Sequence, residues 1–500
     1  MKIDELYALL RRRGFLWPTA EIYGGAQGLY DYGPLGRALK RRLEEAWSAW
    51  FVGRSWDYYR IEPTEIVPEA VVRASGHLEN FTDPEVTCAT CHGAFRAETV
   101  LEKVRPDGID GLTPLQIEEI VRSSHVRCPN CGASTLAVPE PFHLMFDLPF
   151  GVRGGERAYL LPETAQSSYL AFARMREVGR KALPLGIAVV GRAYRNEIAP
   201  RQVLFRMRAF TQAELQIFFD PAEPPGTLGA SASETIPVLR ADRRARGEGS
   251  TERLRASELV ASGLPEFYVD HLVHYYRFLR DVLGYPSERL RFLEKSERER
   301  AFYNRLQFDA ELHLESLAGA KEIGAVHYRG DYDLTRHGAA SGRDLSVVRA
   351  DGQRIVPHVL ELTFGVDRNL WALADALLGV EGDRTVWRLP PYLAPIAVGV
   401  FPLIAKEHRP FARQLAEELR SAGIPTEYDE ASSIGRRYAR MDEVGTPYCV
   451  TVDAGTVGDG PERGTVTLRA RDTKAQERVP AAELAGRISP ALRPPWPPPR

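Results

Sequence analysis

Two stretches with strand-like alternation, joined by a polar loop, constrain the fold of this chain more than any other feature. They run from Ile187 to Glu197 and from Arg208 to Phe219, and the loop between them contains Pro200. Side chains that alternate with a period of two point to opposite faces of a strand. One face of the second stretch is apolar, and the other carries Phe210, Gln212, Glu214 and Gln216. The segment therefore predicts an antiparallel hairpin with one helix-covered apolar face and one polar face that holds a single aromatic ring.

The polar face of this hairpin has the chemistry that a nucleotide requires. The ring of Phe210 offers a stacking surface for a base, and the carboxylate of Glu197 can accept a hydrogen bond from an exocyclic amine. The guanidinium groups of Arg195, Arg206 and Arg208 suit phosphates, which they can bind with two parallel hydrogen bonds. The alternative is a solvated sheet face whose charges confer only solubility.

Two later segments add further polar groups to strand-like runs. One carries Glu322 and Arg329. In the other, Glu361 and Thr363 share a strand face, and the strand passes through a glycine into a helix with Arg368 in its first turn. Such a junction gathers free backbone N–H groups, a partial positive charge and a guanidinium, which together favour a phosphate chain.

Four of the five cysteines form two C-x2-C pairs, Cys88 with Cys91 and Cys128 with Cys131. Two such turns supply the four thiolates of a tetrahedral zinc site, which would be structural because it has no open position. The long gap between the pairs predicts a folded segment within it. The alternatives are four reduced surface thiols or a redox pair. Cys449 lies in an apolar run and is expected to be an ordinary core residue.

The composition is that of an ordinary globular protein, with 44% apolar and 26% charged residues. The net charge of -2 gives no overall basic field, so any nucleic-acid contact must come from a local patch. The longest apolar stretch is too short to span a membrane, and acidic residues near the start do not match a signal peptide. We therefore expect a soluble cytoplasmic protein.

The chain divides by pattern into several parts. An amphipathic helix is expected over residues 35–51, followed by a strand over residues 58–66 and an insertion of different texture. Residues 240–255 read as an exposed, mobile, Arg-rich loop, and residues 396–452 alternate strand and helix. The predicted parts are an N-terminal part of the catalytic domain (1–87), a zinc-binding insertion (88–138), a catalytic core (139–389), a C-terminal α/β domain (390–490) and a Pro-rich tail (491–500).

Together these segments resemble the three motifs of the class II aminoacyl-tRNA synthetases, and in detail the bacterial-type dimeric glycyl-tRNA synthetases. The helix and strand ending at Pro68 match the first motif, Arg195 to Phe210 the second, and Gly365 to Arg368 the third. More specific matches are Glu21-Ile-Tyr-Gly-Gly, Asp31-Tyr-Gly-Pro-Leu-Gly, Ser75-Gly-His, Pro162-Glu-Thr-Ala-Gln, Arg195-Asn-Glu-Ile and Asp442-Glu-Val-Gly-Thr-Pro. The resemblance spans roughly residues 1–490.

The resemblance implies an α+β fold: an antiparallel class II sheet with flanking helices, a zinc-binding insertion and an anticodon-binding C-terminal domain. It implies activation of glycine by ATP with Mg²⁺, transfer to tRNA(Gly), and a homodimer built on the first motif. Arg195, Glu322 and Arg368 would be catalytic. The implied ATP-binding residues are Arg195, Asn196, Glu197, Phe205, Arg206, Arg208, Phe210, Glu322, Ile323, Gly365, Asp367 and Arg368.

The glycine site implied by the resemblance is rich in carboxylates. It comprises Arg73, Glu163, Gln212, Glu214, Arg329, Glu361 and Thr363. The chain departs from the family pattern at Leu161, Ser167, Ser168, Leu362 and Thr363. These departures leave two alternatives open: a synthetase-like RNA-binding or regulatory protein without charging activity, and the same fold activating another small amino acid such as alanine or serine.

Overall fold

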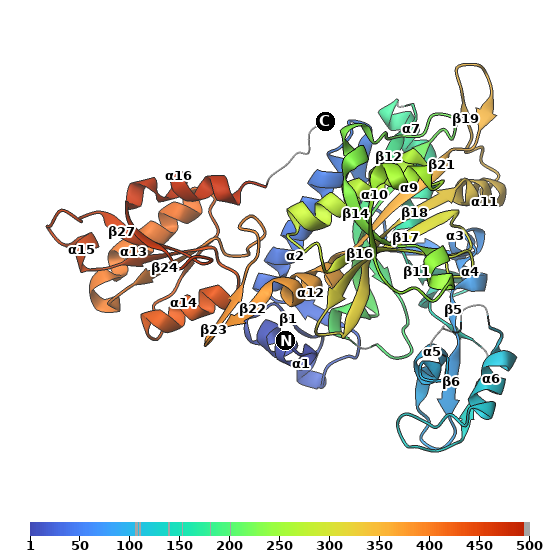
Figure 1. The fold of residues 1–500 in the computed structure, drawn as a ribbon, viewed down its shortest axis with the longest axis horizontal. Coiled ribbons are helices and arrows are strands. Elements are labelled where there is room, and N and C mark those ends of the chain that lie inside the picture. Colours follow the sequence, from blue (N-terminus) through green and yellow to red (C-terminus); the bar gives the residue numbers. More distant parts are fainter. Residues whose placement is uncertain are drawn as a thin grey trace.

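The structure, a computed structural model, describes residues 1–105, 109, 112–138, 141–152, 154–180, 182–200 and 202–494. Residues 495–500 of the expected Pro-rich tail lie outside the described residues. Figure 1 shows a large mixed body, a C-terminal domain to one side of it, and a small insertion that hangs from its other end. No helix in these ranges is both long enough and apolar enough to cross a membrane.

A nine-stranded, mostly antiparallel sheet forms the centre of the large body. Its strand order is β15-β14-β16-β17-β18-β21-β13-β12-β3, and only the β12–β3 and β14–β16 pairs are parallel. The bounds in that order are Glu252–Arg255, Thr235–Leu239, Leu290–Glu294, Leu306–Leu314, Gly319–Gly330, His358–Gly365, Ala209–Phe219, Leu185–Tyr194 and Tyr58–Ile61. The predicted hairpin is β12 and β13, paired from Leu185 with Phe218 to Tyr194 with Ala209.

Helices cover the apolar face of this sheet. The helices α2 (Pro34–Trp47), α10 (Glu266–Arg277) and α12 (Val366–Leu377) share one buried cluster with β13, β18 and β21. The expected amphipathic helix is α2, and a π-helical turn, Ser48–Val52, continues it. On the other face, α7 (Ala165–Gly179) and α11 (Tyr332–Ser341) pack over one end of the sheet. The remaining polar part of that face is free to line a pocket.

Two expectations about local structure were wrong. The strand predicted over residues 58–66 is two strands, because β3 ends at Ile61 and β4 (Ile66–Pro68) joins β11 (Glu156–Leu160) in another sheet. Pro63 lies between them and has no N–H for a ladder. The predicted 240–255 loop holds α8 (Ala241–Ala245) and β15, because its arginines find carboxylates; Arg244, for example, donates to both oxygens of Glu299.

The insertion is a separate small unit. It contains β6 (Glu85–Cys88), β7 (Ala94–Arg96), α5 (Ala97–Leu101), α6 (Pro114–Ser123) and β8 (Leu136–Ala137), around its own apolar cluster. The strands β5 (Thr82–Asp83) and β9 (Phe142–His143) pair at its base. This short ladder joins the insertion to the large body close to the polar face of the sheet (Figure 1).

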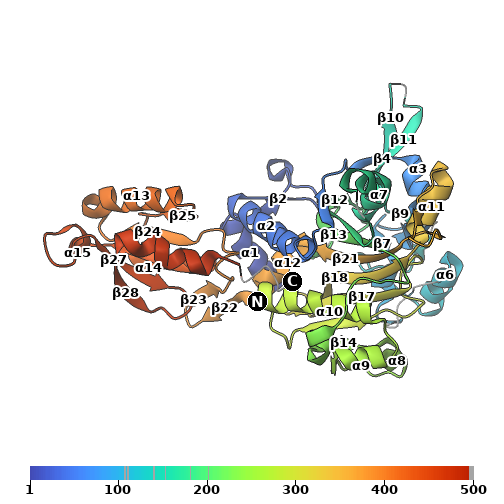
Figure 2. The same cartoon turned by 90° about the horizontal axis from the view of Figure 1, so that it is seen from above.

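The C-terminal domain has a five-stranded mixed sheet with the order β25-β24-β26-β27-β28. The strand β24 (Val398–Pro402) runs parallel to both β25 (Thr426–Tyr428) and β26 (Tyr448–Val452). The antiparallel strands β27 (Thr465–Ala470) and β28 (Gln476–Pro480) complete it, and α13 (Ala405–Ser421) packs into the same core. The hairpin of β22 (Leu378–Glu381) and β23 (Arg384–Trp387) leads from the large body, and α14 (Ile434–Glu443) packs on it (Figure 2).

Candidate functional site

A pocket of about 370 Å³ lies on the polar face of the central sheet, and we call it the central pocket. It lies between the β12–β13 hairpin, the C-terminal end of β21 and the base of the insertion. Most of the residues predicted for ATP line it. They are Arg195, Glu197, Phe205, Arg206, Phe210, Glu322, Ile323, Gly365, Asp367 and Arg368, together with Gln212 and Thr363 from the predicted glycine set.

Arg195 is held rigidly at the centre of this pocket. Its guanidinium lies between the rings of Phe81 and Phe210, 5.2 Å from each ring centroid. Its Nε donates to the carbonyl oxygen of Pro162 at 3.1 Å. The stacking and the hydrogen bond fix the plane of the guanidinium while its terminal nitrogens remain available to a ligand. Phe81 was not predicted, because no local pattern connects a residue at the base of the insertion with the hairpin.

Glu197 presents an unsatisfied acceptor to the pocket. Its Oε2 is buried and has no hydrogen-bond partner, and the nearest cation, Arg206, is 3.8 Å away. A buried acceptor without a donor is costly, so this atom favours a ligand that brings an N–H. The exocyclic amine of an adenine has that chemistry.

Arg368 and Glu322 form an ion pair of 3.2 Å at the opposite end of the pocket, and Arg368 also lies over the ring of Phe205. Desolvation raises the pKa of Glu322, but Arg368 and Lys295 outweigh it and lower the pKa below its usual value. An ionised carboxylate with partly exposed oxygens is a suitable ligand for Mg²⁺.

Three residues of the predicted ATP set have structural partners instead of facing the pocket freely. Asp367 accepts from the hydroxyl of Tyr32 and the backbone N–H of Thr211, and burial raises its pKa. Arg208 donates to backbone carbonyl groups of Gln27 and Glu197. The backbone N–H of Asn196 donates to the carbonyl oxygen of Leu144 at 2.7 Å, and Asn196 and Arg208 are not in the pocket wall.

A buried cluster of charges lies beneath the central pocket. The guanidinium of Arg329, which is 1% exposed, donates twice to Asp333 at 2.8 and 2.9 Å and once to Glu361 at 2.8 Å. It also lies 3.8 Å from the ring centroid of Tyr303. Burial alone raises the pKa of Glu361, but Arg329 and then His327 lower it to about 2. Asp333 and Tyr303 were not predicted, because β18 ends and α11 begins between Arg329 and Asp333.

Two further carboxyl groups lie in the same cluster and differ in charge. Burial raises the pKa of Glu163, but His77 and Arg329 lower it below its usual value. The pKa of Glu214 is raised well above its usual value by burial, then by the charges of Glu361 and Glu163. Thr164 donates to Glu214 at 2.7 Å. The cluster therefore holds one carboxyl group neutral, which is the state expected where another cation has yet to enter.

Arg73 lies apart from this cluster. It is exposed and pairs with Glu69 within α3 (Glu69–Ala74), so its role toward a substrate stays a prediction. Two of the departures from the family pattern also lie outside the central pocket. Leu362 packs into the main core on the opposite face of the sheet, and Leu161 lies in a small apolar cluster with Val67. These two leucines therefore fill cores instead of reshaping a ligand site.

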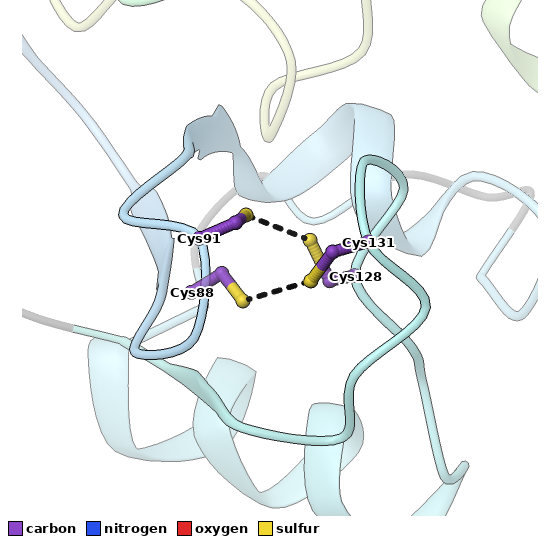
Figure 3. A group of neighbouring side chains, drawn as sticks. All are labelled: Cys88, Cys91, Cys128 and Cys131. Atoms are coloured by element: carbon purple, nitrogen blue, oxygen red, sulfur yellow. Dashed lines mark hydrogen bonds between the residues drawn. The ribbon is translucent and has the colours of Figure 1, made fainter.

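The four cysteines of the insertion converge in one cluster, as Figure 3 shows. The Sγ atoms of Cys88 and Cys131 are 3.6 Å apart, and those of Cys91 and Cys128 are 3.7 Å apart. Zn–S bonds of about 2.3 Å in a tetrahedron require S–S separations of about 3.8 Å. The backbone N–H of Cys91 is the main cause that lowers the pKa of Cys88 to about 6. The donor set and its spacing therefore fit a structural Zn²⁺.

The comparisons with known proteins match a domain, a set of relatives and a fold. A family model described as "Anticodon binding domain" matches residues 394–490. The glycine–tRNA ligase of Thermococcus gammatolerans is 36% identical, over 97% of this chain and 98% of its own length. The glycine–tRNA ligase of Aeropyrum pernix is 37% identical, over 97% of this chain and 96% of its own length. Among solved structures, the chain matches the crystal structure of prolyl-tRNA synthetase from Cryptosporidium parvum, complexed with halofuginone and AMPPNP, with a TM-score of 0.58. The match covers 98% of this chain and 75% of that one. Its identity of 14% shows the class II fold alone.

Proposed function

The chain belongs to the glycine–tRNA ligase family of class II aminoacyl-tRNA synthetases, and we propose that its central pocket activates glycine with ATP and passes it to tRNA(Gly). The observation that carries this proposal is the arrangement of the pocket. A clamped guanidinium lies beside a stacking ring and an unpaired acceptor, above a buried cluster of carboxyl groups. The α-phosphate of a nucleotide and the carboxylate of glycine would thus meet at the guanidinium of Arg195, with the glycine ammonium directed to the carboxyl groups.

The proposed first step is an in-line displacement at the α-phosphorus. A carboxylate oxygen of glycine forms a bond to phosphorus, and the bond from phosphorus to the bridging oxygen breaks, so that pyrophosphate leaves. The chain needs no general base for this step and contributes positioning and positive charge. Arg195 would stabilise the charge at the α-phosphate, Phe210 would stack on the base, and Arg368 would bind the γ-phosphate. Mg²⁺ held near Glu322 would supply further neutralisation of the phosphates.

Glycine offers only its two charged groups for recognition. We propose that Glu163, Glu214 and Glu361 bind its ammonium group and that Thr363 closes the pocket over it. The pocket must also be filled to reject alanine, because one methylene in a roomy site discriminates by only about 1–3 kcal/mol.

The remaining assignments concern assembly and the bound metal. The relatives named above are archaeal enzymes, so the resemblance to the bacterial-type α2 form is part of the proposal: a cytoplasmic homodimer built on α2, with Zn²⁺ held by the four cysteines. The domain boundaries 1–87, 88–138, 139–389 and 390–490 are also part of this proposal. A cleft of about 500 Å³ adjoins the central pocket, and its basic residues Arg105 of the insertion, Arg206 and Lys321 support an approach of the tRNA acceptor end from that side.

The test is glycine-dependent exchange of pyrophosphate into ATP by the purified chain, with alanine and serine measured in parallel. We expect glycine-selective exchange, and charging of tRNA(Gly) in a second assay. Exchange that is faster with alanine or serine would replace the proposal with activation of another small amino acid. Binding of ATP without exchange for any amino acid would favour the RNA-binding or regulatory alternative.

A further inference from the structure

His327 is a buried titratable residue that none of the roles above uses. It lies on β18 directly opposite Glu361 of β21, and Glu361 lies opposite Gln216 of β13. These three side chains form a row across the sheet, next to the row of Glu214 and Thr363. The imidazole is 13% exposed, and its Nδ1 is hydrogen-bonded to Oε1 of Glu361. His327 therefore touches the carboxylate that we assign to the glycine ammonium.

Both oxygens of Glu361 already have donors in the absence of a substrate. Oε1 accepts from Thr363 at 2.9 Å and is joined to His327. Oε2 accepts from Arg329 and from Gln216, each at 2.8 Å, and from the neutral hydroxyl of Tyr169 of α7 at 3.5 Å. An ammonium group that approaches Glu361 must therefore compete with the groups already present. Threonine and glutamine are neutral, and Arg329 keeps its charge at every accessible pH. Among the donors to Glu361, only His327 can give up a positive charge.

The surroundings favour the charged form of His327 as long as no other cation is present. Burial lowers the pKa of His327, but Glu361 and then Asp309 of β17 raise it above its usual value, with Arg329 opposing them. The charge of Glu322, on the same strand as His327, raises the pKa of Asp309, and the charge of Lys295 lowers it. The second ring nitrogen, Nε2, is buried and has no hydrogen-bond partner. A proton on Nε2 is thus held by the negative field alone, and a second cation beside Glu361 would remove that field.

We infer that His327 positions Glu361 for the amino acid and that its proton is exchanged for the glycine ammonium. When glycine binds, the imidazolium releases one proton to solvent and the neutral ring keeps its Nδ1–H donor to Oε1. The inference rests on the proposed function, because it assigns the ammonium to this carboxylate. Release of one proton makes the affinity for glycine rise about tenfold per pH unit below the pKa of His327, and the affinity levels off above it.

The experiment measures the KM for glycine in pyrophosphate exchange at saturating ATP, between about pH 5.5 and 8.5. His327→Asn keeps an N–H donor at the position of Nδ1 but cannot titrate, whereas His327→Ala loses the donor as well as the titratable group. His358→Gln is the matched control, since His358 lies at the other end of β21, bonds to Tyr328 and is outside the central pocket. We expect the KM of the wild type and of His358→Gln to fall as the pH rises, and that of His327→Asn to fall less steeply, because Glu214 is then the remaining neutral group of the cluster that can lose a proton to the ammonium.

The variant pair also separates positioning from a merely structural role. We expect His327→Ala to raise the KM for glycine at every pH while the KM for ATP stays within about twofold of the wild type. Calorimetry in buffers of different ionisation enthalpy must then detect about one proton fewer released on glycine binding by His327→Asn than by the wild type. An unchanged pH slope in His327→Asn, or a pH-independent KM in the wild type, would overturn the inference and leave the proposed function standing. Absence of glycine-dependent exchange at every pH would overturn both.

Discussion

Replacement of Arg195 by lysine is the sharpest test of how the central pocket works. Lysine keeps the positive charge but loses the planar fork, the stacking between Phe81 and Phe210 and the hydrogen bond to Pro162. The loss of one charge-assisted hydrogen bond to a phosphate costs about 1.5–3 kcal/mol. The loss of stacking at a partly exposed site adds about 0.5–1 kcal/mol. The total of about 2–4 kcal/mol predicts a fall of about 30- to 900-fold in kcat/KM for ATP.

The assay is glycine-dependent pyrophosphate exchange at varied ATP and saturating glycine. Arg192→Lys is the matched control, because Arg192 is an exposed arginine near the end of β12, three residues before Arg195 and outside the central pocket. We expect the control to stay within about twofold of the wild type. A value of kcat/KM for Arg195→Lys above about one third of the wild-type value would refute the argument that the fork geometry matters. An equal loss in Arg192→Lys would refute the assignment of the effect to the pocket.

The remaining predictions concern the metal, the charge cluster and the C-terminal domain. Elemental analysis should find one zinc per chain and a loss of most of it in Cys131→Ser, since three thiolates leave one position open. Glu214→Gln should retain the wild-type unfolding temperature, because the carboxyl group is already neutral, yet raise the KM for glycine at least tenfold. Because the pKa of Glu361 is lowered to about 2 in the fold, from a usual 4.5, its ionised form stabilises the protein above about pH 4.5. The stability advantage of the wild type over Glu361→Gln should therefore shrink between about pH 4.5 and pH 2 in urea unfolding. Asp442→Ala should lower the free energy of unfolding of the C-terminal domain by about 3 kcal/mol, because it leaves the buried Arg469 without its carboxylate partner and takes one of two carboxylate partners from Arg384.

Several parts of the pocket were predictable because they depend on residues close together in the chain. The hairpin of β12 and β13 has the predicted period of two, and Phe210 and Arg195 are neighbours because the two strands pair. The four cysteines were also predictable, since each C-x2-C turn places two sulfur atoms on one side of a short loop. The family resemblance located the third motif, whose Arg368 lies in the first turn of α12 and lines the pocket.

Other features were not accessible to pattern reasoning. Leu362 differs from the family pattern and therefore seemed to alter the amino-acid pocket, but it packs into the core on the opposite face of the sheet. Asp367 was predicted for the ATP site and lines the pocket, but the sequence does not show that its two oxygens accept hydrogen bonds from Tyr32 and Thr211. The 240–255 segment has the composition of a loop, and it is structured because distant carboxylates pair with its arginines. In each case the deciding partner is far away in the sequence.

The local chemistry of this protein can be read along the chain: the alternation of the central strands, the two cysteine turns and the motifs that reveal the family. Covalent geometry and short-range periodicity set these features. Which charges meet, by contrast, depends on the fold. Strand register places His327 opposite Glu361, and the pairing of β5 with β9 at the base of the insertion brings Phe81 against Arg195. A shift of one residue in register would turn each of these side chains to the opposite face, so their roles depend on contacts formed across the whole sheet.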